Sequence, residues 1–340
     1  MAKIAVGSTG IIVEQNGFGA LPIQRISDEE AVKLLRRAYD GGIEYYDTAR
    51  AYTDSEEKLG HAFGDMRDKV TIATKTMAQD ANGFWSDLET SLKLLKTNHI
   101  DIYQFHNPAF CPKPGDESGL YDAALEAKRQ GKIRFIGFTN HRIDVAREAV
   151  ESGLYDTLQF PFSYLSTEKE LGLVDACRKK GMGFIAMKAL SGGLITNAEA
   201  ACAWLTRFDN VIPIWGIQRE RELDDFLKCI AKPPALTDEL KTFIEEDRKA
   251  LMGDFCRGCG YCMPCPQGIV INTCARASLL LRRAPKEMLL NDDGIAMMKK
   301  VADCIECGQC AAKCPYGLDT PALLKQNYQD FMEILDGKPL

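Results

Sequence analysis

Short runs of β-branched and aromatic residues alternate with longer stretches of helical periodicity from about residue 17 to residue 231. A strand-like run followed by about 10–15 residues of helix-like pattern is typical of βαβ units, which build a parallel sheet. The predicted strands are Gly17–Ala20, Ile43–Asp47, Val70–Lys75, Asp101–His106, Ile133–Phe138, Thr157–Phe160, Gly183–Met187 and Val211–Ile214. The predicted helices are Asp28–Asp40, Ser55–Phe63, Phe84–Lys96, Leu120–Gln130, Ile143–Glu151, Thr167–Lys180, Asn197–Arg207 and Glu220–Ile230.

Eight strand–helix pairs within roughly 200 residues predict an α/β fold, a closed parallel (β/α)8 TIM barrel. An open doubly wound sheet fits less well, because no Gly-x-Gly-x-x-Gly fingerprint follows an early strand. Ahead of the barrel, Lys3–Val6 and Ile11–Val13 flank a glycine-containing turn and predict a hairpin. We expect this N-terminal hairpin to close the bottom of the barrel.

The pattern changes after Lys232-Pro233-Pro234. A helix is predicted at Asp238–Ala250, and two cysteine runs follow with helical segments around Thr273–Arg283 and Gly294–Val301. The amphipathic stretch Pro321–Leu335 predicts a last helix, which we expect to pack on the barrel. The predicted domains are therefore a barrel over residues 1–235, a small, mainly α-helical domain over 236–320, and a C-terminal helix and tail over 321–340.

Composition narrows the classes of partner. The chain has 340 residues, of which 46% are hydrophobic and 26% charged, and its formal net charge is −6. An acidic chain disfavours a nucleic-acid partner and an anionic membrane surface. No apolar stretch is long enough to span a bilayer, and the first ten residues do not resemble a signal peptide. We therefore expect a cytoplasmic protein.

Cysteine is concentrated near the C-terminus: nine of the 13 cysteines fall within residues 256–314. Without a secretion signal, metal ligation explains such a cluster better than disulfides do. The second run, Cys304-x2-Cys307-x2-Cys310-x3-Cys314-Pro315, matches the bacterial [4Fe–4S] pattern. The first run has evenly spaced cysteines before Pro266, namely Cys256, Cys259, Cys262 and Cys265.

In two-cluster ferredoxins the last cysteine of each run ligates the other cluster. Cys314 is therefore expected to join Cys256, Cys259 and Cys262, and Cys265 to join the second run. Zinc is the competing interpretation, but zinc modules usually separate two Cys-x2-Cys pairs by a loop. The even spacing thus favours two [4Fe–4S] clusters and, with them, an anaerobic or reducing cytosol. Cys274 is expected to be a buried spare thiol.

Four polar residues lie at or just beyond the carboxyl ends of three predicted barrel strands, where barrel active sites form. These are Asp47, Tyr52, Lys75 and His106. The ordinary pKa of a tyrosine is about 10, and an adjacent ammonium lowers it. We therefore expect Tyr52 to act as a general acid beside Lys75, with Asp47 holding Lys75 and His106 orienting a carbonyl substrate.

The segments Asp47–Tyr52, Ser55–Gly60, Ala73–Lys75 and Asp101–His106 resemble the aldo-keto reductases, and the resemblance runs from Phe18 to about Ile230. It implies that Asp47, Tyr52, Lys75 and His106 form a catalytic tetrad and that the cofactor is NADP(H) or NAD(H). Cys259–Pro266 and the following cysteines further resemble the family members that carry a C-terminal ferredoxin-type domain.

The same resemblance implies positions that contact the cofactor. Asn140, after the fifth strand, and Gln159, in the sixth, would hold the carboxamide. Lys188 stands where a serine is common, and Gly216 ends the last strand. The usual basic clamp for a 2′-phosphate is shifted: Glu222 lies near the expected arginine, and Arg219 or Arg221 would substitute.

Nicotinamide exchanges two electrons as a hydride, whereas a [4Fe–4S] cluster ordinarily exchanges one, so a flavin or a radical-tolerant substrate would be needed between them. No motif identifies a flavin site. We expect an oxidoreductase that reduces a carbonyl or related small-molecule substrate, with the clusters relaying electrons to or from a ferredoxin or flavoprotein. Two alternatives stay open: an NAD(P)H carbonyl reductase with purely structural clusters, and a non-catalytic redox-responsive subunit.

Overall fold

The computed structural model describes residues 3–251, 255–283 and 289–339. The chain divides into two compact units. The first contains the chain up to residue 189 together with residues 198–241, and the second contains residues 190–197 and the chain from residue 242 onward. The division therefore falls inside helix α9 (Asp238–Ala250), and a segment from the middle of the chain belongs with the C-terminal unit.

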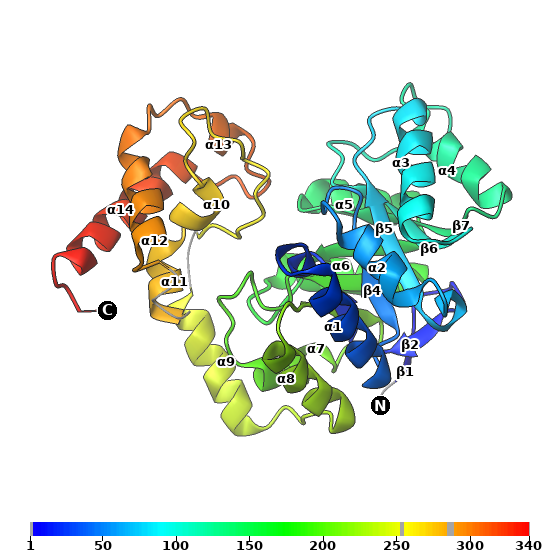
Figure 1. Cartoon of the computed structure of the whole chain (residues 1–340), viewed down its shortest axis with the longest axis horizontal. Helices are drawn as coiled ribbons and strands as arrows, with labels where there is room; N and C mark the ends of the chain where they lie inside the picture. The colour runs from blue at the N-terminus through cyan, green and yellow to red at the C-terminus, as the bar shows by residue number, and fades with distance from the viewer. Residues whose placement is uncertain (1–2, 252–254, 284–288, 340) are drawn as a thin grey trace. The chain divides into compact units, whose positions relative to one another are not determined.

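The first unit is a closed barrel of eight parallel strands, as predicted. Closure comes from the last strand, which pairs with its predecessor through Val211–Pro213 and with the first barrel strand through Ile214–Gly216. Figure 1 shows the strands surrounded by helices. The strands are β3 (Gly17–Gly19), β4 (Tyr45–Asp47), β5 (Thr71–Thr76), β6 (Ile100–His106), β7 (Ile133–Thr139), β8 (Thr157–Pro161), β9 (Gly183–Met187) and β10 (Val211–Gly216).

The outer helices follow the strands in order and differ from the predicted bounds by at most a few residues. Ser27 and Glu30 form a capping box at the start of the first helix, where they satisfy exposed backbone groups. Two 3-10 turns, η1 (Pro22–Arg25) and η2 (Arg67–Lys69), were not predicted. The helices are α1 (Asp28–Asp40), α2 (Ser55–Phe63), α3 (Ala81–Leu94), α4 (Leu120–Arg129), α5 (Ile143–Ser152), α6 (Glu168–Lys180), α7 (Ala198–Leu205) and α8 (Glu220–Ala231).

The N-terminal hairpin closes the bottom of the barrel. Its strands β1 (Lys3–Ala5) and β2 (Ile12–Glu14) pair antiparallel. Ile4, Val6 and Val13 join a buried cluster with apolar side chains from the barrel strands. Gly7 adopts a positive φ of 55° and lies against the backbone of residues 181–183, where a Cβ atom would collide.

The second unit is helical (Figure 1). It has its own apolar core. Besides the C-terminal part of α9, it contains α10 (Ile271–Cys274), α11 (Ala277–Arg283), α12 (Asp292–Lys299), the turn η4 (Lys300–Asp303), α13 (Gln309–Ala312) and α14 (Thr320–Leu335). The expectation that the last helix packs on the barrel is wrong: Leu324 and Phe331 of α14 lie in the core of this unit. Within the described residues, no helix has both the length and the apolar character to cross a membrane.

The predicted helix Thr273–Arg283 is also wrong as a single element, because it breaks into α10 and α11. Asn327 of α14 explains the break. Its side-chain amide donates to the Ala275 carbonyl at 3.1 Å, and its oxygen accepts from the Ser278 amide at 2.9 Å. A residue distant in sequence thus replaces local helical hydrogen bonds, which a helical periodicity cannot predict.

Candidate active site and iron–sulfur centres

Alternate residues of the barrel strands point inward, so each strand contributes to successive layers. Tyr45, Ala73 and Ile102 belong to the apolar layer at the bottom. Two residues further along the same strands come Asp47, Lys75 and Gln104, which are all buried. The polar residues predicted at the strand ends are therefore brought together by strand alternation above an apolar base.

Asp47 and Lys75 form a buried ion pair. Lys75 Nζ donates to Asp47 Oδ1 and to the Thr48 carbonyl, each at 2.6 Å. Burial raises the pKa of Asp47 and lowers that of Lys75, while the attraction between the two charges opposes both shifts. Side-chain amides of Gln104 and Gln159 donate to the carboxylate at 3.2 Å and also favour its ionised form.

Tyr52 and His106 complete the group of four. Lys75 Nζ lies 5.3 Å from the centre of the Tyr52 ring. The Tyr52 and His106 rings meet edge to face with their centres 5.9 Å apart. Burial and then the charge of Lys75 lower the pKa of His106 to about 3, so its imidazole is neutral at physiological pH. A neutral imidazole can still donate one hydrogen bond.

The loop that carries Tyr52 is anchored at both sides. Thr48 Oγ1 and Ser55 Oγ lie 2.8 Å apart, and Ser55 Oγ also donates to the Ala20 carbonyl at 3.0 Å. Glu56 is buried at the start of α2 and accepts from Thr74 Oγ1 at 2.6 Å, while Arg50 pairs with its other oxygen. These contacts hold the chain in place on both sides of Tyr52.

Gln104 is the contact that the sequence analysis missed. It lies two residues before His106 on β6, and the strand alternation of Ile102, Gln104 and His106 could have identified it. Gly137 makes room for it from the neighbouring strand, because a Cβ atom there would lie 2.6 Å from Gln104 Cγ. Gln104 thereby reaches the second oxygen of Asp47.

The two residues predicted to hold a carboxamide differ in how far their side-chain amides are already hydrogen-bonded to the protein. Gln159 Oε1 is buried in the middle of β8 and has no hydrogen-bond partner among the described residues, so it fits an amide donor such as nicotinamide. Asn140, in contrast, uses its side chain on the protein: it donates to the Pro108 carbonyl at 2.9 Å and accepts from the Arg142 amide at 2.8 Å. The carboxamide role of both residues stays a prediction.

The remaining residues predicted to contact the cofactor lie at or just after the ends of β9 and β10. Lys188 adopts a positive φ of 54° directly after β9. Burial and then the charge of Lys188 lower the pKa of His141. Gly216 ends β10 beside Gly19. Arg219 and Arg221 are exposed at the start of α8. Glu222 accepts from the Gln218 and Arg219 backbone amides at 2.9 and 3.1 Å, so its carboxylate caps this helix.

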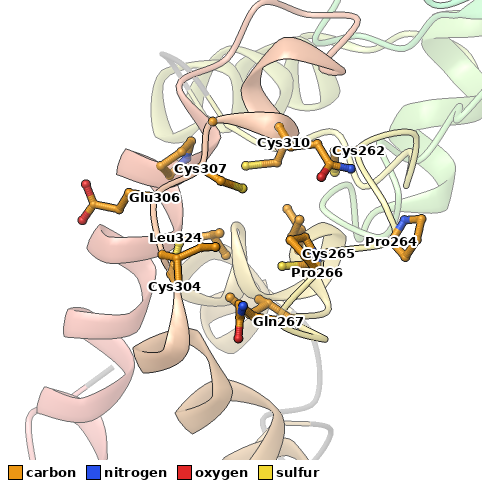
Figure 2. A pocket seen from close by; sticks show the side chains of 16 residues that line it. Cys262, Pro264, Cys265, Pro266, Gln267, Cys304, Glu306, Cys307, Cys310 and Leu324 are labelled. Atoms are coloured by element: carbon orange, nitrogen blue, oxygen red, sulfur yellow. The ribbon is translucent and has the colours of Figure 1, made fainter.

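The second cysteine run lines a cavity in the helical unit. The sulfur-bearing residues of this cavity are Cys262, Cys265, Cys304, Cys307 and Cys310. Figure 2 shows the sulfurs of Cys265, Cys307 and Cys310 pointing toward the space between the two runs. Cys265 is thus brought to the run that the cross-ligation pattern assigns to it, and a set of thiolates around apolar walls suits an iron–sulfur cluster.

The first run gathers around Cys256. Cys256 interacts electrostatically with Cys259 and Cys314, and Cys262 interacts with Cys256 and Cys259. Burial raises the pKa of Cys256, and it raises that of Cys262 to about 12. Cys274 is fully buried, and its Sγ lies 3.8 Å from the Met297 carbonyl. The structure thus brings Cys314 to the first run, and the ligand assignments themselves stay predictions.

Comparison with known proteins identifies both parts of the chain. Residues 15–201 match the Aldo/keto reductase family, and residues 255–319 match the 4Fe-4S dicluster domain. The second match favours iron–sulfur over zinc for the two cysteine runs.

Individual relatives agree with the first match. The uncharacterized oxidoreductase YrpG of Bacillus subtilis is 32% identical over 56% of this chain and 67% of its own length. L-galactose dehydrogenase of Arabidopsis thaliana is 29% identical over 58% of this chain and 69% of its own length. An aldo-keto reductase structure from Bacillus halodurans superposes with a TM-score of 0.65 at 20% identity, covering 75% of this chain and 98% of that one.

Proposed function

Because the chain belongs to the aldo/keto reductase family and carries a 4Fe-4S dicluster domain, we propose that it reduces a carbonyl group with Tyr52 as proton donor while two [4Fe–4S] clusters relay electrons. The oxidoreductase class follows from the family. The convergence of Tyr52, Lys75 and His106 at one end of the barrel supports the specific role of Tyr52.

The four residues have separate roles in this proposal. The Lys75 ammonium lies beside the Tyr52 ring and eases loss of the phenol proton to the substrate oxygen. Asp47 keeps Lys75 charged and fixes its position through the 2.6 Å ion pair. Neutral His106 donates a hydrogen bond to the same oxygen and so orients the carbonyl.

The electron supply follows the chemistry of the two kinds of cofactor. A bound nicotinamide supplies a hydride, and each cluster supplies one electron at a time. Reduction of one carbonyl consumes two electrons and two protons. With a nicotinamide, the hydride would carry both electrons and one hydrogen, and Tyr52 would add the proton. With the clusters, two one-electron steps on a radical-tolerant substrate would supply the electrons, while Tyr52 would add one proton and solvent the other. Gln159 Oε1, with its open acceptor position, is the proposed contact for the nicotinamide carboxamide, and the eight cysteines of the two runs are the proposed cluster ligands.

A single-electron partner fits the exposed part of the second run. Ile305 is 61% exposed, and the adjacent Glu306 and Cys307 are also exposed. An apolar side chain beside a cluster ligand is suited to brief contact with another redox protein. We propose a ferredoxin or flavoprotein as the partner that exchanges electrons with this loop.

The test uses the anaerobically purified holoenzyme and its Tyr52→Phe variant. We expect the variant to lose about 10²–10⁴-fold in kcat across a panel of carbonyl substrates while iron content and Tm stay unchanged. Tyr39→Phe is the matched control, because Tyr39 lies on outer helix α1 and packs against Phe63. Full turnover in Tyr52→Phe would contradict the acid role.

A second measurement tests the relay. The clusters are reduced with dithionite, the excess reductant is removed, and the carbonyl panel is added without nicotinamide. We expect substrate-dependent reoxidation of the clusters. If only NADH or NADPH supports turnover, and the carbonyl substrates never reoxidise the reduced clusters, the clusters are structural and the relay proposal is wrong.

A further inference from the structure

Arg276 packs its guanidinium against the first cysteine run. The residue lies in the break between α10 and α11, and it faces Gly258, which stands between Cys256 and Cys259. A Cβ atom at Gly258 would lie 2.6 Å from Arg276 Cζ and 2.8 Å from both terminal nitrogens. Gly258 also has a positive φ of 65°. Glycine is therefore required for this close approach.

The charge of Arg276 has no carboxylate partner among the described residues. Nε donates to the Asn272 carbonyl at 3.0 Å, and Nη1 donates to the Gly192 carbonyl at 2.8 Å. Its interacting ionisable groups are the thiols of Cys256 and Cys259. The guanidinium thus keeps its full positive charge and presents it to two of the proposed ligands of the first cluster.

The second run has a different electrostatic setting. Cys310 interacts with Cys304 and Cys307, and the main electrostatic influences on its thiol come from these two cysteines rather than from a cation. Glu306, between Cys304 and Cys307, is an exposed carboxylate. Lys300, which precedes this run, is already paired with Asp303 at 2.7 Å. One cluster site therefore has a cation against it, and the other has an acidic residue within its loop.

We propose that Arg276 is a positioning residue that raises the reduction potential of the first cluster above that of the second. Each one-electron reduction adds one negative charge to a cluster, and a fixed cation in partly buried surroundings stabilises the added charge. The backbone amide of Gly258, which donates to Cys256 Sγ at 3.4 Å, acts in the same direction. An electron that enters at the exposed second run then moves to the first cluster.

Arg276 also connects the first cluster to a segment that continues from a barrel strand. Gly192 belongs to residues 190–197, which pack with the helical unit and directly follow β9 and Lys188 in the chain. Arg283 makes a similar contact to the Leu194 carbonyl at 3.2 Å. The cluster with the higher potential is thus the one whose surroundings include the segment that follows β9 in the chain. The direction of electron flow rests on the proposed function, whereas the difference in potential does not.

The test is an anaerobic redox titration of the full chain, with the reduced clusters followed by electron paramagnetic resonance. In Arg276→Gln we expect the reduced-to-oxidised ratio of the first cluster to fall at least tenfold at a fixed potential, a shift of about 59 mV. Arg276→Lys keeps the charge and should restore most of the potential. Arg282→Gln is the matched control, because Arg282 lies on α11 but pairs with Asp330 at 2.6 Å.

Iron and sulfide content is measured in every variant, and the signals are assigned with Cys307→Ser, which is expected to lose the second cluster. Unchanged potentials in a fully loaded Arg276→Gln overturn the proposal, as does an equal loss in Arg276→Lys. If Arg276→Gln does not load iron, Gly258→Ala decides the question, because its Cβ displaces the guanidinium without removing the arginine. An unchanged potential of the first cluster in Gly258→Ala also overturns the proposal. None of these measurements depends on carbonyl turnover. A failure of the proposed function can therefore be distinguished from a failure of the proposed role of Arg276.

Discussion

The ammonium of Lys75 donates to the carboxylate of Asp47 at 2.6 Å, although the two residues come from different strands and are only 1% and 2% exposed. Two charges that are buried away from water are stable only as an ion pair, because an isolated buried ion loses its hydration without compensation. The pair is therefore both a structural requirement of the barrel and the support on which the proposed acid, Tyr52, depends.

Removing one charge of this pair should destabilise the barrel strongly. We expect Asp47→Asn to lower the free energy of unfolding by about 3–5 kcal/mol, because Lys75 is left as a buried unpaired cation. Urea unfolding followed by tryptophan fluorescence measures this, since Trp85, Trp204 and Trp215 all lie in the barrel unit. The double variant Asp47→Asn/Lys75→Met should be more stable than Asp47→Asn, and equal losses in the two would count against the ion-pair argument.

His106 predicts a dependence of stability on pH. Its pKa is about 3 in the folded protein, whereas an unfolded histidine has a pKa of about 6.5. Between these values the unfolded chain binds the proton more tightly, so stability is full above pH 6.5 and falls as the pH decreases. By about pH 5 the loss reaches at most about 2 kcal/mol.

Comparing the unfolding free energies at about pH 7.5 and pH 5 measures this contribution. His106→Gln should show a smaller difference between the two pH values than the unsubstituted protein. His61→Gln serves as the control, since His61 lies on α2 and contacts Asp28 at 2.7 Å. If the pH dependence of His106→Gln equals that of the unsubstituted protein, His106 does not carry it.

The cysteine assignments predict opposite outcomes for two similar substitutions. Cys265→Ser should lose about half of the iron and sulfide, because Cys265 lines the cavity of the second run and supplies the fourth ligand there. Cys274→Ser should keep the full content, because that thiol is in contact with the Met297 carbonyl. Chemical analysis of iron and acid-labile sulfide after anaerobic purification distinguishes them. Full iron in Cys265→Ser, or half in Cys274→Ser, would require a different ligand set.

Glu222 is expected to influence the choice of nicotinamide cofactor. Its carboxylate caps α8 beside the exposed Arg219 and Arg221, the residues proposed to meet a 2′-phosphate. We expect Glu222→Gln to strengthen NADPH binding about 2–5-fold, because a negative charge at the helix start is removed while an oxygen remains to accept the backbone amides. Titration by fluorescence quenching measures both affinities. NADH binding should stay unchanged, and an equal gain for NADH would show that the 2′-phosphate is not involved.

Much of the site was predictable because its determinants are local. Asp47 and Lys75 end predicted strands and His106 ends a third, and parallel strands in a barrel bring their carboxyl ends to one rim. The hairpin and the limits of α1 follow from glycine turns and from the Ser27–Glu30 capping box, which are close by in the sequence. The iron–sulfur domain was predictable from spacing alone, because a cluster needs several thiolates within a short segment.

Contacts between distant residues were not predictable in this way. Asn327 breaks the expected helix around Arg276, and the last helix packs into the helical unit through Leu324 and Phe331 rather than on the barrel. Residues 190–197 join that unit although they lie between barrel elements in the sequence. Each outcome depends on which surfaces meet after folding, and no local pattern contains that information.

The order of residues alone determined the eight-fold strand and helix repeat, the strand-end polar groups and the two thiolate runs, since periodicity and short spacings act within a few residues. Tertiary structure decided that Gln104 and Gln159 hold Asp47, and that Arg276 reaches Gly258 and Gly192. The physical reason is that hydrogen bonds and electrostatic interactions act through space. Their partners are therefore selected only when the folded backbone brings distant residues within a few ångströms of one another.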